Sequence, residues 1–186
     1  MGDPNAPVPD ATHIFDVLSR HNVNFILVGG YAGIAHGASR VTRDVDVVPQ
    51  NTDDNLERLA TALKELNAGA RVEGLDEPIP RPIDAYVLRN ELTTWRTDAG
   101  DIEVILWLPA DNKQTLPYEL LKDDAEQFQI GNGTAVLVAS LDHIIESKIA
   151  IGREPDLVAL PELRDLQSRQ QREAQRRQPP KRGLDF

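Results

Sequence analysis

FILVGGYAGIAHGASRVTRDVDVVP, residues 25–49, is the part of this sequence that decides the fold. Residues 24–28 are mostly apolar and predict a buried strand, which breaks at Gly29 and Gly30. Residues 31–36 then predict a short helix. A turn without Cβ atoms that leads into a helix can bring backbone N–H groups close to a phosphate. The first half of the stretch therefore favours a phosphate-binding turn over a plain tight turn.

The second half of the stretch carries two carboxylates on a predicted strand over 44–48, which Pro49 ends. Residues two apart on a strand point to the same side, so Asp44 and Asp46 share one face and the intervening valine faces the core. Neighbouring carboxylates repel each other, and hard oxygen ligands favour Mg²⁺ or Mn²⁺ over softer metals. An exposed strand face would also explain the pair, but the glycine turn before it favours a metal next to a phosphate. This combination predicts nucleotide chemistry.

These residues carry a family resemblance. Gly29-Gly30, then Arg40, Thr42 and the Asp44-Val45-Asp46 pair resemble the active-site signature of the DNA polymerase β-like nucleotidyltransferases. Within that superfamily the chain is most similar to the prokaryotic toxin branch, the AbiEii and MenT-type enzymes. Residues 140–163, SLDHIIESKIAIGREPDLVALPEL, resemble the downstream helix and loop of that branch, in which a Lys precedes a Gly-Arg turn and an Asp. Together these patches span about residues 23–163.

The resemblance implies a set of site residues. Three metal ligands are expected to hold Mg²⁺ or Mn²⁺ and, with Lys148, to be catalytic: Asp44, Asp46 and Glu103. Glu103 stands in the strand after Gly100, where the family often has Asp, and Asp101 lies two residues earlier on the same face. The expected nucleotide-binding residues are Gly29, Gly30, Arg40, Lys148, Arg153 and Asp156.

Arg40 and Lys148 of this set, and Arg43 beside the carboxylate pair, also have a structural explanation. Arg40 and Arg43 could be surface charges, although one Arg next to a carboxylate pair can bind triphosphate while the other braces an acid. Lys148 could simply extend its ammonium to solvent from an apolar helix. Asp156 is expected to orient Lys148 or Arg153 rather than to bind metal.

Length and composition bound the domain organisation. At 186 residues the chain is long enough for one domain, which we expect over 10–163, after an unfolded segment over 1–9. The absence of cysteine excludes disulfides and thiolate metal sites. No apolar stretch approaches the length of a membrane span, and the N-terminus lacks the basic and apolar regions of a signal peptide. A cytoplasmic protein without membrane contact is the resulting expectation.

Charge is distributed unevenly along the chain. The net charge of −10 argues against a broad nucleic-acid-coating surface. Residues 161–186, however, hold seven Lys and Arg against four acids. We expect residues 164–186 to form a basic tail, partly helical or disordered, which could touch phosphates or simply be solvated.

Periodicity and turn residues predict an α+β domain: a mixed sheet with helices mainly on one face and a small helical C-terminal part. The expected helices are 10–21, 31–36, 52–67, 116–122, one beginning after Ser140 and one beginning near Pro155 or Pro161. The expected strands are 24–28, 44–48, 83–88 and the hairpins 93–97 with 101–108 and 127–130 with 135–138. Residues 68–82 are expected to be a loop with short strand pieces.

The resulting functional prediction is a metal-dependent nucleotidyltransferase that moves NMP from an NTP to an acceptor hydroxyl and releases pyrophosphate. The resemblance implies a toxin with an RNA acceptor, the tRNA 3′ end, and a cognate antitoxin protein. A minimal nucleotidyltransferase that modifies a protein or an antibiotic is the first alternative. The shorter members of the superfamily usually have a Gly-Ser pair where this chain has Gly29-Gly30, and this difference favours the toxin branch. A catalytically dead binding module is the second alternative, and the intact acids speak against it.

Overall fold

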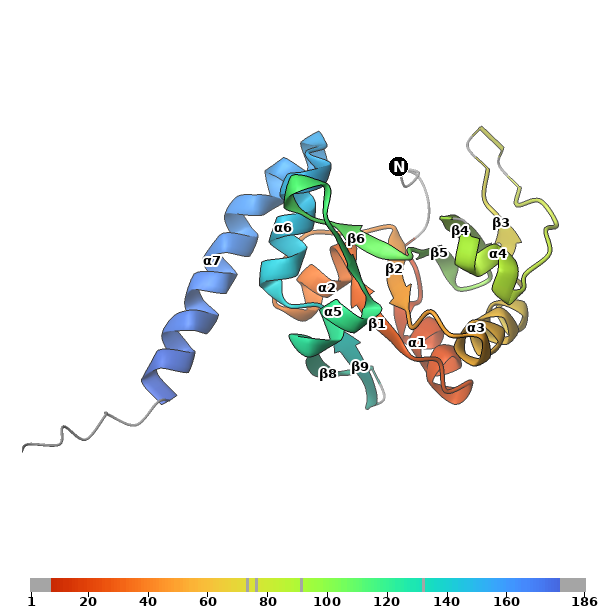
Figure 1. Cartoon of the computed structure of the whole chain (residues 1–186), viewed down its shortest axis with the longest axis horizontal. Helices are drawn as coiled ribbons and strands as arrows, with labels where there is room; N and C mark the ends of the chain where they lie inside the picture. The colour runs from red at the N-terminus through yellow and green to blue at the C-terminus, as the bar shows by residue number, and fades with distance from the viewer. Residues whose placement is uncertain (1–7, 73, 76, 91, 132, 178–186) are drawn as a thin grey trace, which may run out of the picture.

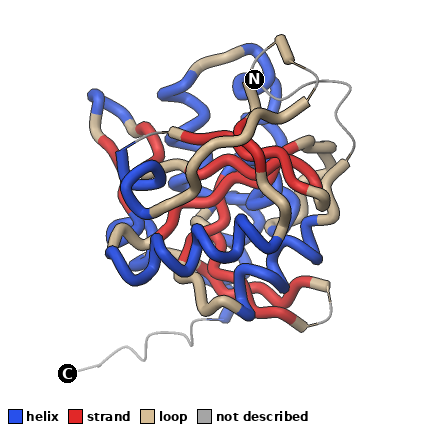
Figure 2. The backbone as a smooth tube through the Cα atoms, turned by 90° about the vertical axis from the view of Figure 1, so that its right-hand side faces the viewer, coloured by secondary structure: helices blue, strands red, loops and turns tan. Residues whose placement is uncertain are grey.

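Seven strands form one mixed sheet in the middle of the molecule, in the order β3-β4-β5-β2-β1-β9-β8, and Figure 2 shows the helices around it. The computed structural model describes residues 8–72, 74–75, 77–90, 92–131 and 133–177. The strands of the sheet are β1 (Phe25–Val28), β2 (Asp44–Pro49), β3 (Gly69–Ala70), β4 (Thr93–Thr97), β5 (Gly100–Val104), β8 (Glu126–Ile130) and β9 (Thr134–Val138). A separate two-stranded sheet pairs β6 (Trp107–Pro109) with β7 (Thr115–Pro117).

Helices connect most of these strands. They are α1 (Ala11–Arg20), α2 (Gly29–Ala35), α3 (Asp53–Glu65), α4 (Ala85–Asn90), α5 (Tyr118–Asp123), α6 (Leu141–Ile151), α7 (Glu154–Arg177) and the short 3₁₀ helix η1 (Asp111–Lys113). This architecture confirms the expected α+β class with a mixed sheet and a helical C-terminal part. None of the helices in the described ranges has both the length and the apolar composition that crossing a bilayer requires.

The centre of the sheet explains why residues 25–49 dominate the fold. All four residues of β1 are buried, and β2 is buried from Val45 onward. β1 pairs antiparallel with β2 and parallel with β9, while β2 pairs parallel with β5. Phe15 of α1 stacks on Phe25 with ring centroids 6.2 Å apart, so α1 covers the face of β1 to which Phe25 points. Val28 lies three residues after Phe25 and points to the opposite face, and its partner Asp46 points there too.

Two helices make up the C-terminal part. The side chain of Ser140 accepts a hydrogen bond from the His143 N–H and caps α6, which ends at Gly152 in the left-handed conformation at φ 67°. α7 then runs back along α6 and extends beyond the rest of the molecule (Figure 1). Hydrogen bonds hold it to the α2 region: Ser39 donates to Glu162, and Gln170 pairs with the buried ring of His36. The first part of the predicted basic tail is thus helical to Arg177, and its last nine residues lie outside the described ranges.

Four local predictions are wrong. The strand predicted over 101–108 ends at Val104, and residues 107–109 pair with β7 in the separate sheet. Residues 83–88 do not form a strand, because the Asp84 carboxylate accepts a hydrogen bond from the Val87 N–H and starts α4. Helix α2 begins at Gly29 itself rather than after the glycines. Pro9, placed in an unfolded segment, is buried against Gly100, while residues 1–7 lie outside the described ranges. Helix α7 begins next to Pro155 as predicted and continues through Pro161.

Candidate active site

Parallel pairing of β2 with β5 assembles three acids on one face of the sheet. Its register sets Asp46 opposite Glu103 and Asp44 opposite Asp101. One carboxylate oxygen from each of Asp44, Asp46 and Glu103 lies within 4.8 Å of the others. We call these three residues the acidic triad. In the described part of the chain no other group of three or more His, Asp and Glu side chains meets this spacing. The structure therefore brings together the three residues predicted as metal ligands.

The charged form of Asp46 is destabilised within the triad. Only 8% of the residue is exposed. Burial raises its pKa well above the usual value, and the negative charges of Asp44 and Glu103 raise it further. A hydrogen bond from the Gly30 backbone N–H partly offsets these effects. Thr42 supports the neighbouring acid, because its hydroxyl donates to Asp44 Oδ1 over 3.1 Å. The site thus concentrates negative charge that a bound cation would neutralise.

The two glycines allow α2 to start directly against these carboxylates. Gly29 has φ +64°, and a Cβ placed on it would lie 1.8 Å from Asp46 Oδ2. A Cβ on Gly30 would lie 2.5 Å from the Thr42 hydroxyl oxygen. The backbone N–H of Gly30 donates a hydrogen bond to the Asp46 carboxylate in this structure. Phosphate binding by the glycine turn stays a prediction, whereas its role in shaping the triad follows from these contacts.

Gly29→Ala is expected to damage the site and the fold together. The new methyl group must displace the Asp46 side chain, and an L-residue at positive φ costs about 1–2 kcal/mol by itself. Gly74→Ala is the matched control, because Gly74 also has positive φ, at +84°, but its Cβ would meet no atom within 4 Å. Thermal unfolding should show a clearly larger loss for Gly29→Ala. Equal losses would show that the backbone conformation alone, without the contact to Asp46, requires glycine.

A second set of charges comes from the α6–α7 turn. The buried carboxylate of Asp156 binds Lys148 Nζ at 3.0 Å and Arg153 Nε at 2.8 Å. Burial alone would raise the pKa of Asp156, but hydrogen bonds from Arg153 and Lys148 outweigh it and lower the pKa. We call these three residues the Asp156 cluster. The orienting role expected for Asp156 agrees with this geometry.

Arg153 connects the Asp156 cluster with the acidic triad. The hydrogen bond to Asp156 is the main reason why the pKa of Arg153 is raised, and the negative charges of Glu103 and Asp46 contribute as well. About half of the Arg153 side chain is exposed, so its guanidinium remains accessible. The end of α6 and the turn after it therefore present two cations held by Asp156, and one of them, Arg153, interacts with the acids of the triad. This arrangement suits a ligand that carries phosphates and a metal.

The described interaction of Arg40 is with α7. Arg40 is exposed on the loop between α2 and β2, and its charge helps to lower the pKa of Glu162 in α7 after the two hydrogen bonds from Ser39. Its contact with the triphosphate stays a prediction.

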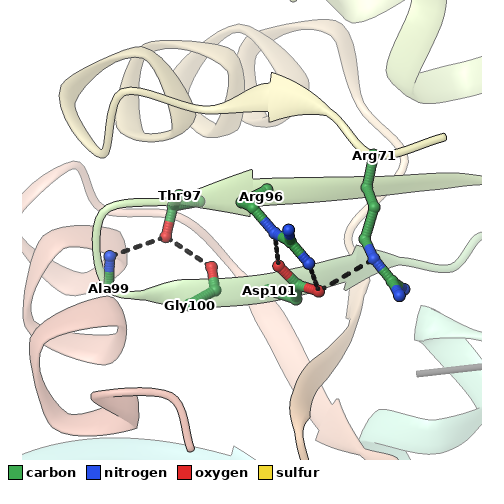
Figure 3. A network of polar contacts seen from close by, with 6 residues as sticks. All are labelled: Arg71, Arg96, Thr97, Ala99, Gly100 and Asp101. Carbon is green, nitrogen blue, oxygen red and sulfur yellow. Dashed lines mark hydrogen bonds and ion pairs between the residues drawn. The ribbon is translucent and has the colours of Figure 1, made fainter. Parts of the chain in front are cut away.

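Two arginines that the sequence pattern did not indicate as site residues bind Asp101, next to the triad (Figure 3). Asp101 accepts from Arg96 Nε over 2.9 Å and pairs with Arg71 Nε at 3.2 Å, and its side chain is only 4% exposed. We call Arg71, Arg96 and Asp101 the Asp101 cluster. Asp101 therefore binds arginines instead of joining the triad. The predicted hairpin already placed Arg96 near Asp101, whereas Arg71 lies in a segment without a clear sequence pattern.

The structure resembles solved nucleotidyltransferases. A candidate nucleotidyltransferase from Thermotoga maritima matches with a TM-score of 0.52 and 13% identity over 83% of this chain and 90% of that chain. The lincosamide antibiotic adenylyltransferase LnuA, in a lincomycin-bound structure, matches with a TM-score of 0.55 and 12% identity over 84% of this chain and 95% of that chain. No protein-family model and no curated protein matches the sequence. The chain therefore has the nucleotidyltransferase fold, and its acidic triad lies on strands β2 and β5.

Proposed function

We propose that this protein is a metal-dependent nucleotidyltransferase that transfers NMP from an NTP to an acceptor hydroxyl. The carrying observation is the acidic triad, in which three carboxylate oxygens lie within 4.8 Å of one another. The Asp156 cluster next to it supports the proposal, since nucleotidyl transfer requires the triphosphate to be held and its charge neutralised. The likeness in fold to solved nucleotidyltransferases adds support.

The donor set of the triad fits Mg²⁺ or Mn²⁺. Three carboxylates supply hard oxygen ligands, and burial together with their mutual repulsion raises the pKa of Asp46. A divalent cation would relieve that repulsion and, when bound, would stabilise negative charge on the transferred phosphoryl group and activate the acceptor hydroxyl. Asp44, Asp46 and Glu103 would hold it, and Thr42 would orient Asp44.

The protein groups have separable tasks in this reaction. Lys148 and Arg153 bind the triphosphate, and Asp156 fixes both side chains before the ligand arrives. The acceptor oxygen forms a bond to the α-phosphorus while the bond to the bridging α–β oxygen breaks, and pyrophosphate leaves. A carboxylate oxygen of the triad accepts the hydroxyl proton. The cations of the Asp156 cluster neutralise charge that develops on the leaving pyrophosphate.

For the acceptor, we propose the 3′ end of an RNA, with tRNA as the first candidate. The toxin-branch resemblance over residues 23–163 supports this acceptor, and it also supports an antitoxin protein as the partner. Modification of an antibiotic is the second candidate, and the fold likeness to a lincosamide adenylyltransferase favours it. Modification of a protein would use the same chemistry.

One incubation separates these acceptors. Purified protein is mixed with each α-³²P-labelled NTP and Mg²⁺, together with total tRNA, total cell protein or a lincosamide, and the products are resolved by gel or thin-layer chromatography. The proposal expects label on tRNA with one preferred NTP and release of pyrophosphate. Label on protein or on the antibiotic would transfer the assignment to that alternative. No incorporation into any acceptor would contradict the nucleotidyltransferase proposal itself.

A further inference from the structure

Two buried carboxylates stand on the two sides of the acidic triad, and each of them holds two cations. Asp156 holds Lys148 and Arg153, and Asp101 holds Arg71 and Arg96. The Asp156 and Asp101 side chains are 5% and 4% exposed. Each cluster therefore holds two cationic side chains on one buried carboxylate, next to the site of proposed chemistry. The function proposed above uses only the Asp156 cluster.

Strand register places the Asp101 cluster on the same face of the sheet as the triad. In the β4–β5 pair, Arg96 stands opposite Asp101 and Thr94 stands opposite Glu103. Directly paired residues share a face, and so do residues two apart on one strand. The Arg71 backbone N–H donates to the Thr94 carbonyl over 2.9 Å. Arg71 therefore lies level with Thr94 and with its cross-strand partner Glu103. Figure 3 shows the Arg71 and Arg96 guanidiniums converging on Asp101.

The two clusters lie on opposite sides of the triad. In the sheet, β1 and β9 flank β2, while β4 and β3 flank β5. Arg96 belongs to β4 and Arg71 follows β3. In Figure 1, β3 and β4 lie to one side of β2 and β5, and helices α6 and α7 lie to the other. In nucleotidyl transfer, the attacking and leaving oxygens are roughly in line through the phosphorus. If pyrophosphate leaves toward the Asp156 cluster, the acceptor hydroxyl must approach from the Asp101 cluster.

We propose that the Asp101 cluster is the acceptor subsite and that it selects an acceptor with a phosphodiester next to the attacking hydroxyl, which is the 3′ end of a polynucleotide. This inference rests on the proposed function. Arg71 is the contact residue: it pairs with Asp101 through Nε, and its two terminal nitrogens point away from that carboxylate (Figure 3). A guanidinium bound on one edge can still bind phosphate with the other.

The negative charge of the chain makes local cations necessary for this acceptor. The chain has a net charge of −10, so a polynucleotide is repelled at a distance and needs local cations at the point of contact. The Arg71 and Arg96 side chains are 19% and 27% exposed, and Asp101 holds both, so little side-chain entropy is lost when a phosphate binds.

Arg71→Gln tests the subsite, with Arg20→Gln as the matched control. Arg20 also pairs with one carboxylate, Glu65, but it stands on α1, which covers the sheet face opposite Asp46. The probe is a fluorescein-labelled single-stranded RNA with a free 3′ hydroxyl, measured by anisotropy over a series of salt concentrations, alongside a DNA of the same sequence. Arg71→Gln should weaken RNA binding about 5–10-fold and reduce the slope of log K against log salt by about 0.7. Arg20→Gln should leave both unchanged.

Kinetics separate this inference from the proposed function. With RNA as acceptor, Arg71→Gln should raise the KM for RNA about tenfold and change the KM for NTP less than about twofold. Arg71→Lys, which keeps the charge and the stem, should recover part of the loss. Unaltered RNA binding and KM in a folded Arg71→Gln protein would overturn the subsite while leaving the transfer reaction in place. Transfer to a lincosamide or a protein in preference to polynucleotide would also overturn it. Arg71-dependent RNA binding without any transfer would leave the subsite standing and overturn the enzyme proposal.

Discussion

Asp46→Asn is expected to lower nucleotidyl transfer at least about 1,000-fold, because metal charge stabilisation supplies several kcal/mol of transition-state binding. The substitution keeps the shape of the side chain, and the amide oxygen can still accept from the Gly30 N–H. The fold should therefore survive. The measurement is the rate of pyrophosphate release with saturating Mg²⁺. A folded Asp46→Asn protein with wild-type rate would contradict the metal site.

Asp46→Asn, which should lower activity, should raise the stability of the metal-free protein. Folding raises the pKa of Asp46 above its unfolded value, so this carboxyl destabilises the fold as pH rises through the unfolded pKa and then the folded pKa. At neutral pH, metal-free Asp46→Asn should therefore unfold at a higher temperature than the wild type. The difference should vanish well below about pH 3.9, the usual Asp pKa, where the carboxyl is protonated in both states.

Metal addition completes this experiment. A cation present at 100 times its Kd adds about 2.7 kcal/mol to wild-type stability, which corresponds to a Tm increase of roughly 5–10 °C for a chain of this size. Asp46→Asn should lose most of that increase. Asp16→Asn is a matched control, because Asp16 lies on α1, which covers the opposite face. An equal metal-induced shift in both variants would show that the cation binds elsewhere.

Lys148→Ala should lower kcat/KM for NTP about 100-fold or more, because it removes a fixed positive charge from the triphosphate. Lys148 is held by Asp156 at 3.0 Å, so its side chain is already ordered before the proposed triphosphate binds. Lys148→Arg should retain a small fraction of activity, since its charge survives while its geometry changes. Steady-state kinetics at varied NTP, with RNA saturating, give the measurement.

Two controls define the result for Lys148. Lys64→Ala removes an exposed lysine from α3 and should leave NTP kinetics unchanged. Asp156→Asn should release both Lys148 and Arg153 from their fixed positions and should raise the KM for NTP without removing a cation. Wild-type kinetics in Lys148→Ala would assign that lysine to stabilising α7 through Asp156 rather than to binding nucleotide.

The candidate site is predictable where it depends on neighbours in the sequence. The alternation of side chains along a strand is enough to place Asp44 and Asp46 on one face. The hairpin at residues 93–104 likewise follows from its turn signal, and its register is what brings Arg96 to Asp101. In contrast, the strand predicted at residues 83–88 is wrong, because a capping carboxylate at Asp84 outweighs an apolar pattern too short to distinguish helix from strand.

Sequence by itself determined the local parts of this protein: the two central strands, the glycine break between β1 and α2 and the two carboxylates on one face of β2. Only the tertiary structure decided how those parts meet. Parallel pairing of β2 with β5 sets Glu103 beside Asp46, the turn after α6 brings Arg153 toward both acids, and the path after β3 returns Arg71 to Asp101. The physical reason is the distance along the sequence over which each interaction acts. Backbone alternation and turn residues act over a few positions, whereas the choice of a parallel neighbour depends on burying both faces of the whole sheet, to which residues far apart in the chain contribute together.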